Sequence, residues 1–131
     1  MAVSTMKSGD SLLNAHLGII RSADSGRDAR AAMADSLDRC YVRAITKAGG
    51  AKNGVTRSVI NVHIDRIRTA VFGEEVRDAL KTGLTLCYSA RGISMTSDET
   101  TYLNNLINAQ TGEALKNGII NSIAKCCKDV G

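Results

Sequence analysis

Apolar residues recur at intervals of three and four along the chain, in six segments that form three consecutive pairs. The first segments carry Leu13, Leu17 and Ile20, then Ile60, Ile64 and Ile67, then Leu103 and Leu106. The second segments carry Met33, Leu37 and Cys40, then Val76, Leu80, Leu84 and Cys87, then Leu115, Ile119, Ile123 and Cys126. This spacing places each set on one stripe of a helix, and no segment alternates as a strand would. The pattern predicts an all-α fold with six helices.

The paired segments belong to an internal repeat. When residues 11–41 are aligned with residues 58–88 at an offset of 47, 12 of 31 positions are identical without a gap. Unrelated segments of that length share about two or three identities. A weaker third copy, residues 97–127, follows at an offset of 39 and keeps the apolar frame. We predict three tandem helical hairpins in a single domain spanning residues 1–131, arranged as a short array or a compact bundle.

Turn signals lie where the hairpins require them. Gly26, Gly73 and Gly112 stand between the two helices of each unit, and we expect each to end the first helix in a left-handed conformation. Thr96 and Glu99 have the spacing of a capping box at the start of the third unit. The linker of residues 49–56 has the glycine spacing of a phosphate-binding loop, but Val55 stands where that loop requires lysine. We interpret the linker as a flexible connection.

The composition is that of a soluble globular domain. The chain has 131 residues, of which 44% are hydrophobic and 23% charged, and it contains no proline. No apolar run is long enough to cross a bilayer, and residues 1–10 lack the apolar core of a signal peptide. We therefore expect a cytoplasmic protein with no membrane partner.

The cysteines indicate packing rather than chemistry. Cys40, Cys87 and Cys126 occupy the same position in the three units, on the apolar stripe, where cysteine acts as a small hydrophobe. Only Cys126 and Cys127 are closely spaced, so we predict reduced thiols, with no zinc site and no disulfide. Cys127 replaces the tyrosine of the other units, and we expect it to be the most exposed thiol. We predict no metal and no cofactor.

Two equivalent histidines, His16 and His63, are replaced by Tyr102 in the third unit. Histidine and tyrosine share a flat ring with a polar tip, and we interpret all three as packing residues whose tip reaches a hydrogen bond. No nucleophile stands in a recognised motif with either histidine. We predict no catalytic residues.

The whole chain has a net charge of +4, and its positive charge is concentrated in one segment. Between residues 39 and 68, seven basic residues accompany one acidic residue. These candidate contacts for a polyanion or a partner are Arg39, Arg43, Lys47, Lys52, Arg57, Arg66 and Arg68. The first three are spaced by four and form one basic stripe, with Asp35 available to pair with Arg39. We expect Arg43 and Lys47 on the outer face of a helix. A solvated helix face is the alternative interpretation.

The leading functional hypothesis is a non-enzymatic interaction or assembly protein with a scaffold or structural role. The ends of a short helical array leave apolar faces open, so we expect a homo-oligomer or a complex with another protein. The alternative is a nucleic-acid-binding protein that uses the seven basic residues, against which stand the modest net charge and the scarcity of aromatics. The third interpretation is an enzyme whose catalytic groups converge without a local motif.

Overall fold

The computed structural model describes residues 10–22, 26–70, 73–109 and 112–131. These residues form the helices α1 (Ser11–Ser22), α2 (Gly26–Ala48), α3 (Arg57–Thr69), α4 (Gly73–Arg91), α5 (Ser97–Asn108) and α6 (Gly112–Val130). The described part of the chain contains no strand. The predicted all-α class with six helices is confirmed.

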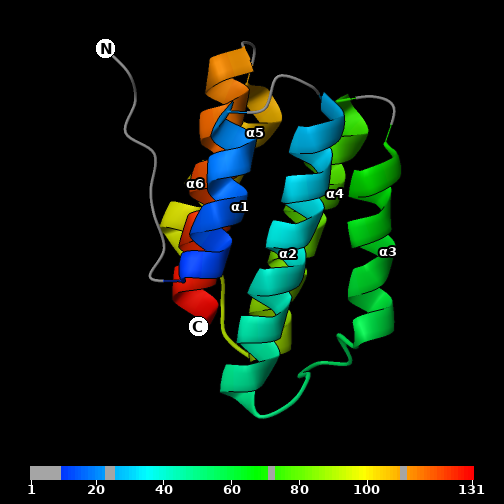
Figure 1. Ribbon diagram of the computed structural model, residues 1–131. Coiled ribbons are helices and arrows are strands. Elements are labelled where there is room, and N and C mark those ends of the chain that lie inside the picture. The colour runs from blue at the N-terminus through cyan, green and yellow to red at the C-terminus, as the bar shows by residue number, and fades with distance from the viewer. Residues whose placement is uncertain (1–9, 23–25, 71–72, 110–111) are drawn as a thin grey trace.

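The helices lie side by side, and neighbours in sequence run in opposite directions (Figure 1). Helices α1, α3 and α5 run toward the upper end of Figure 1, and α2, α4 and α6 return from it. Each returning helix contacts the one before it, and α2, α4 and α6 also contact one another. These contacts are consistent with a bundle whose centre lies between the three longer helices.

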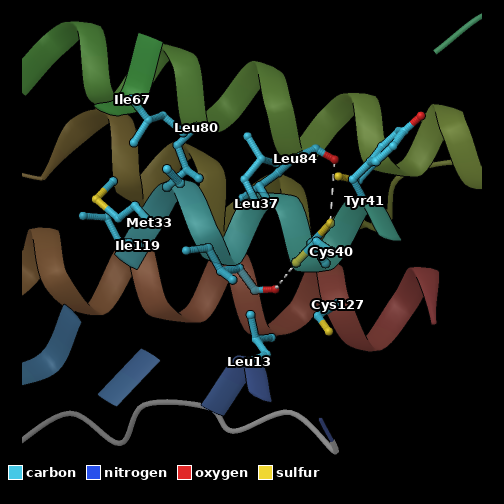
Figure 2. Packing of buried hydrophobic residues seen from close by; sticks show 14 of the residues in the cluster. Leu13, Met33, Leu37, Cys40, Tyr41, Ile67, Leu80, Leu84, Ile119 and Cys127 are labelled. Carbon is cyan, nitrogen blue, oxygen red and sulfur yellow. Dashed lines mark hydrogen bonds between the residues drawn. The ribbon is translucent and has the colours of Figure 1, made fainter. Parts of the chain in front are cut away.

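The apolar stripes predicted from the sequence form the core, with Val76 and Leu115 only partly buried at its margin. The short helices contribute Leu13, Leu17, Ile20, Ile60, Ile64, Ile67, Leu103 and Leu106, each at most 3% exposed. They pack against residues of the long helices such as Leu37, Leu80 and Leu84 (Figure 2). Each large aliphatic side chain buried in this way contributes about 1.5–3 kcal/mol relative to an exposed one. The core therefore accounts for most of the stability of the fold.

Small residues allow the helices to approach closely. Gly83 of α4 and Gly118 of α6 are both buried. A Cβ atom at Gly83 would overlap the side chain of Leu37 in α2, and one at Gly118 would lie 3.1 Å from the Cα atom of Leu106 in α5. The absence of a side chain at these two positions thus sets how closely α4 lies to α2 and α6 to α5.

The expectation that Gly26, Gly73 and Gly112 end the first helix of each unit is wrong. Each glycine is the first residue of the following helix, and none has a positive φ. Helices α3 and α5 are followed by the C-cap residues Ala70 (φ −62°, ψ 135°) and Ala109 (φ −63°, ψ 132°), both in extended backbone. Because an extended residue already leads the chain out of the helix, no left-handed cap is needed.

The linker between α2 and α3, interpreted from the sequence as a flexible connection, makes specific contacts with the bundle. The Tyr41 hydroxyl donates a hydrogen bond to the Val55 carbonyl (2.8 Å), and Val55 is buried. The Lys52 N–H donates to the Ala90 carbonyl (2.9 Å), and the Asn53 side-chain amide donates to a carbonyl in α4 (2.9 Å). Its glycines supply positive φ angles for the turn, while these hydrogen bonds hold the turn against the bundle.

Candidate functional site

The structure separates the seven predicted basic residues into three groups. Arg39, Arg43 and Lys47 lie together on the second half of α2. Lys52 lies in the linker, where its side chain packs over Gly92. The remaining three, Arg57, Arg66 and Arg68, lie on α3. The seven residues therefore lie on three consecutive parts of the chain, namely α2, the linker and α3.

The arginines of α3 pair with carboxylates of neighbouring helices. Arg57 pairs with Asp38 and Arg68 with Asp35 (3.4 Å), both in α2. On the other side, Arg66 pairs with Asp78 of α4 (3.4 Å). Exposed ion pairs of this kind contribute about 0–1 kcal/mol each. They link α3 to both neighbours and compensate part of its positive charge.

The expected pair between Asp35 and Arg39 does not form. Asp35 instead faces Arg68, and Arg39 turns toward Asp10 at the start of α1. The Asp10 carboxylate offers Arg39 a more buried partner than the exposed Asp35. A contact between residues 29 positions apart in sequence thus replaces one between residues four apart.

Asp10 joins the start of α1 to the basic side chains of α2. Its Oδ1 accepts a hydrogen bond from the Leu13 N–H (2.8 Å) and caps α1. Its Oδ2 accepts two hydrogen bonds from Arg39 (2.7 and 3.0 Å) and one from Arg43 (3.0 Å). The Arg39 guanidinium, with smaller contributions from Leu13 and Arg43, holds the pKa of Asp10 well below its usual range although burial opposes this.

Arg39, Arg43 and Lys47 line an open depression of about 400 Å³, together with Val42, Thr46 and Gly131. Lys47 is exposed, whereas the side chains of Arg39 and Arg43 are 32% and 29% exposed because both reach Asp10. Packing of Asp10 against α2 covers them. The Nε atom of Arg43 is buried and has no hydrogen-bond partner. The depression therefore combines positive charge with an unused donor.

All four cysteines are free and buried. The Cys40 thiol donates to the Ile123 carbonyl and the Cys126 thiol to the Leu84 carbonyl, each with an Sγ–O distance of 3.7 Å (Figure 2). Burial raises the pKa of Cys87 and of Cys126, so both thiols stay protonated near neutral pH. The predicted structural role of the cysteines agrees with these positions.

The expectation that Cys127 is the most exposed thiol is wrong, because it is 0% exposed. Helix α1 packs against α6, and Leu13 of α1 lies close to Cys127 in Figure 2. In the described residues, no group of three or more histidine, cysteine, aspartate or glutamate side chains is arranged to hold a metal ion.

The two histidines are half-buried, as expected for packing residues. The hydrogen bond expected at the ring tip is absent at Nδ1 of His63, which is buried and has no partner. Burial lowers the pKa of His63, and the charge of Arg66 acts in the same direction. The ring is therefore neutral near pH 7 and retains one unused ring nitrogen.

Glu99 is a buried carboxylic acid that the sequence analysis treated only as part of a cap. The Thr96 hydroxyl accepts a hydrogen bond from the Glu99 N–H (3.2 Å), which confirms half of the capping box. The side chain of Glu99 turns inward, is 0% exposed, and has no hydrogen-bond partner at either oxygen. Burial raises its pKa to about 9, and the negative charge of Asp129 adds to that shift. Alignment of the units could have revealed it, since Glu99 occupies the position of Leu13 and Ile60.

Asp129 gathers the polar groups near Glu99. Its carboxylate accepts hydrogen bonds from the hydroxyls of Tyr88 (2.6 Å) and Thr96 (3.1 Å), and it pairs with Lys125 (3.1 Å). Burial and the bond to Asp129 raise the pKa of Tyr88. This network satisfies Asp129 and holds the start of α5 against the end of α6.

None of the helices in the described ranges combines the length and apolar character needed to span a membrane. The chain matches no protein-family model, no curated protein and no solved structure.

Proposed function

We propose that this protein is a non-enzymatic assembly protein, built from three tandem helical hairpins, that self-associates through the outer face of α1. The observation that carries the proposal is the exposure of Leu12 (52%) and Ile19 (47%) on that helix. These residues are seven positions apart, and with the exposed Ala15 between them they form one apolar stripe. A second copy of this chain, presenting the same stripe, would cover it.

The charge of α1 favours a second copy as the occupant. Arg21 is the only charged residue among the 12 residues of α1. Two copies of this face therefore approach each other with little repulsion between like charges. Helix α3 also exposes apolar residues, Val59 (38%) and Val62 (55%), but it carries four charged residues among its 13. The less charged helix is the better self-association surface.

The small area of the α1 face sets the expected affinity of the dimer. Pairing one short helix with its copy buries less than the roughly 1,200 Å² of total area found in standard stable interfaces. We therefore expect a dimer with a dissociation constant of about 1 μM or weaker. Val59 and Val62 align with Leu12 and Ala15 in the repeat, which supports a unit whose outer helix is used for contacts.

The experiment is light scattering coupled to size exclusion, over roughly a hundredfold range of protein concentration. The wild type is expected to increase in mass with concentration. The double variant Leu12→Glu/Ile19→Glu is expected to stay monomeric, because it places charge on the stripe. The matched variant Val59→Glu/Val62→Glu makes the same change on α3 and is expected to dimerise like the wild type. A wild type that remains monomeric throughout would reject self-association, and equal behaviour of the two variants would reject α1 as its surface.

A second candidate function, polyanion binding, is favoured by the depression that gathers Arg39, Arg43 and Lys47. If three side chains contact phosphates of duplex DNA, the logarithm of affinity should fall with the logarithm of salt concentration with a slope of about −2.7. Lys47→Gln should reduce that slope by about 0.9, whereas Lys81→Gln on the exposed face of α4 should leave it unchanged. Lys47 is the residue to change, since replacing Arg43 would also remove a contact with Asp10.

A further inference from the structure

A second cavity lies where α2, α4 and α6 begin. It has a volume of about 230 Å³, below the 300–1,000 Å³ typical of pockets for drug-sized ligands. Most of its lining comes from three aligned positions that are present in all three units, and Ile20 of α1 also contributes. The first position supplies Gly26, Gly73 and Gly112, the first residues of the three helices. Three helix starts therefore meet around one cavity.

The wall of the cavity is apolar. The aligned residues Ala29, Val76 and Leu115 line it one turn into the helices, and Met33 and Ile119 line it deeper. Met33 and Ile119 lie next to each other at one end of the core in Figure 2. A wall of this kind favours an alkyl group over a polar ligand, because a polar group placed there would lose its hydrogen bonds to water.

Three basic side chains, Arg30, Arg77 and Lys116, also line the cavity, again from one aligned position. The Nε atoms of Arg30 and Arg77 are buried and have no hydrogen-bond partner. The guanidinium of Arg30 lies close to the start of α2, since its Nη1 would be 3.0 Å from a Cβ at Gly26. Nη1 of Arg77 already donates a hydrogen bond to the Ile107 carbonyl (3.2 Å). The positive charges of Arg30, Arg77 and Lys116 therefore line an apolar cavity, where they would attract an anion.

The backbone adds to this positive potential. The first N–H groups of a helix lack partners within the helix, and its N-terminus carries a partial positive charge. The acidic residues of the first turns, Asp28, Glu74 and Glu113, are exposed and are not part of the lining. The cavity thus offers positive charge and apolar surface at the same place.

We propose that this cavity binds a small amphiphilic anion, an alkyl carboxylate with a short chain, whose alkyl group enters between the three helices while its carboxylate contacts Arg30 and Arg77. The three aligned positions make the site a joint product of α2, α4 and α6, so no single hairpin contains it. This site is separate from the α1 face and from the basic depression of α2.

Titration of the full chain with octanoate tests the proposal. Binding is measured by calorimetry and by the methyl NMR signals of Met33, Val76 and Leu115. Octanoate below its micelle concentration should shift these signals saturably. Octanol has the same chain without the charge, and acetate has the charge without the chain, so each should bind roughly tenfold more weakly or worse. Equal binding of octanol and octanoate, or no shift with octanoate, would overturn the proposal.

Variants then test the named residues. Arg30→Gln/Arg77→Gln should weaken octanoate binding roughly tenfold or more. The control Arg27→Gln/Lys81→Gln removes the same charge from exposed positions of the same helices and should bind like the wild type. Ala29→Phe keeps every charge but fills the cavity, and it should abolish binding with the helical circular dichroism signal unchanged. Unchanged affinity in either the arginine variant or the Ala29 variant would reject the site, and each variant decides the question if the other fails to fold.

Discussion

Glu99 illustrates how one buried ionisable side chain can control the pH dependence of stability. Its pKa is about 9 in the folded chain, compared with about 4.3 for an unperturbed glutamate. Between these two values the folded state holds a proton that the unfolded state has released. The free energy of unfolding therefore falls as pH rises through this window, and the stabilisation is fully present only below the lower value.

Glu99→Gln should remove this dependence, because glutamine has nearly the same shape and cannot ionise. We expect the variant to gain stability over the wild type as pH rises from about 5 to about 9, by at most about 1.4 kcal/mol per pH unit. Urea unfolding at several pH values in this range measures the difference. Parallel stability curves for the two proteins would show that Glu99 does not remain protonated in the folded chain.

Asp10 has the opposite linkage, because its pKa is lowered in the folded chain. Its contribution is present at neutral pH and is lost as pH falls below about 4, where the unfolded state takes up the proton first. Asp10→Asn keeps a side chain that can cap α1 but loses the ion pairs with Arg39 and Arg43.

We expect Asp10→Asn to cost about 1 kcal/mol at neutral pH, a value kept low because both arginines retain contact with solvent. Asp10→Ala should cost about 1 kcal/mol more through loss of the cap. Thermal unfolding at neutral pH and at low pH distinguishes the contribution of the ion pairs from that of the helix cap. The cost of Asp10→Asn should shrink on acidification, and a cost that stays constant with pH would contradict the ion-pair explanation.

At the scale of helices, two glycines that both lie inside a helix have different roles. Gly18 of α1 has no atom within 4 Å of an added Cβ, whereas a Cβ at Gly83 of α4 would overlap Leu37. Gly18→Ala should stabilise the chain by about 0.5–1 kcal/mol, since alanine loses less backbone freedom in a helix. Gly83→Ala should destabilise it by about 1–3 kcal/mol, since the close packing of α2 and α4 must adjust. Chemical denaturation of both variants at one low concentration tests this difference in sign.

The helices could be predicted from the sequence because each apolar stripe has a regular spacing. Leu13, Leu17 and Ile20, for example, are all buried where the pattern placed them. The turns could not be predicted, because Ala70 and Ala109 leave their helices in an extended conformation that glycine signals do not report. The ion-pair partners of the arginines could not be predicted from local sequence either, because some partners are distant along the chain. Arg39, for example, pairs with Asp10, 29 positions away.

At the scale of the whole molecule, the arrangement of the three long helices determines which predicted residues meet. Sequence analysis grouped seven basic residues because they are close along the chain, but the fold brings together only Arg39, Arg43 and Lys47. The cavity residues Arg30, Arg77 and Lys116 are 47 and 39 positions apart in succession, and their convergence depends on α2, α4 and α6 starting at the same end of the bundle. Alignment of the units identified these positions as equivalent, whereas only the structure shows them lining one cavity.

The buried cysteines can also be used to measure how often the helices separate from one another. Cys40, Cys87 and Cys126 lie on three different helices, and each is 0% exposed, so an alkylating reagent can reach them only after the bundle opens locally or globally. The rate at which each thiol is modified, read by peptide mass spectrometry, then measures how often its helix separates from the others. We expect native protein to react at least tenfold more slowly than urea-unfolded protein at all four cysteines. Equal rates at Cys40, Cys87 and Cys126 would mean that α2, α4 and α6 separate together, and unequal rates would mean that they separate independently.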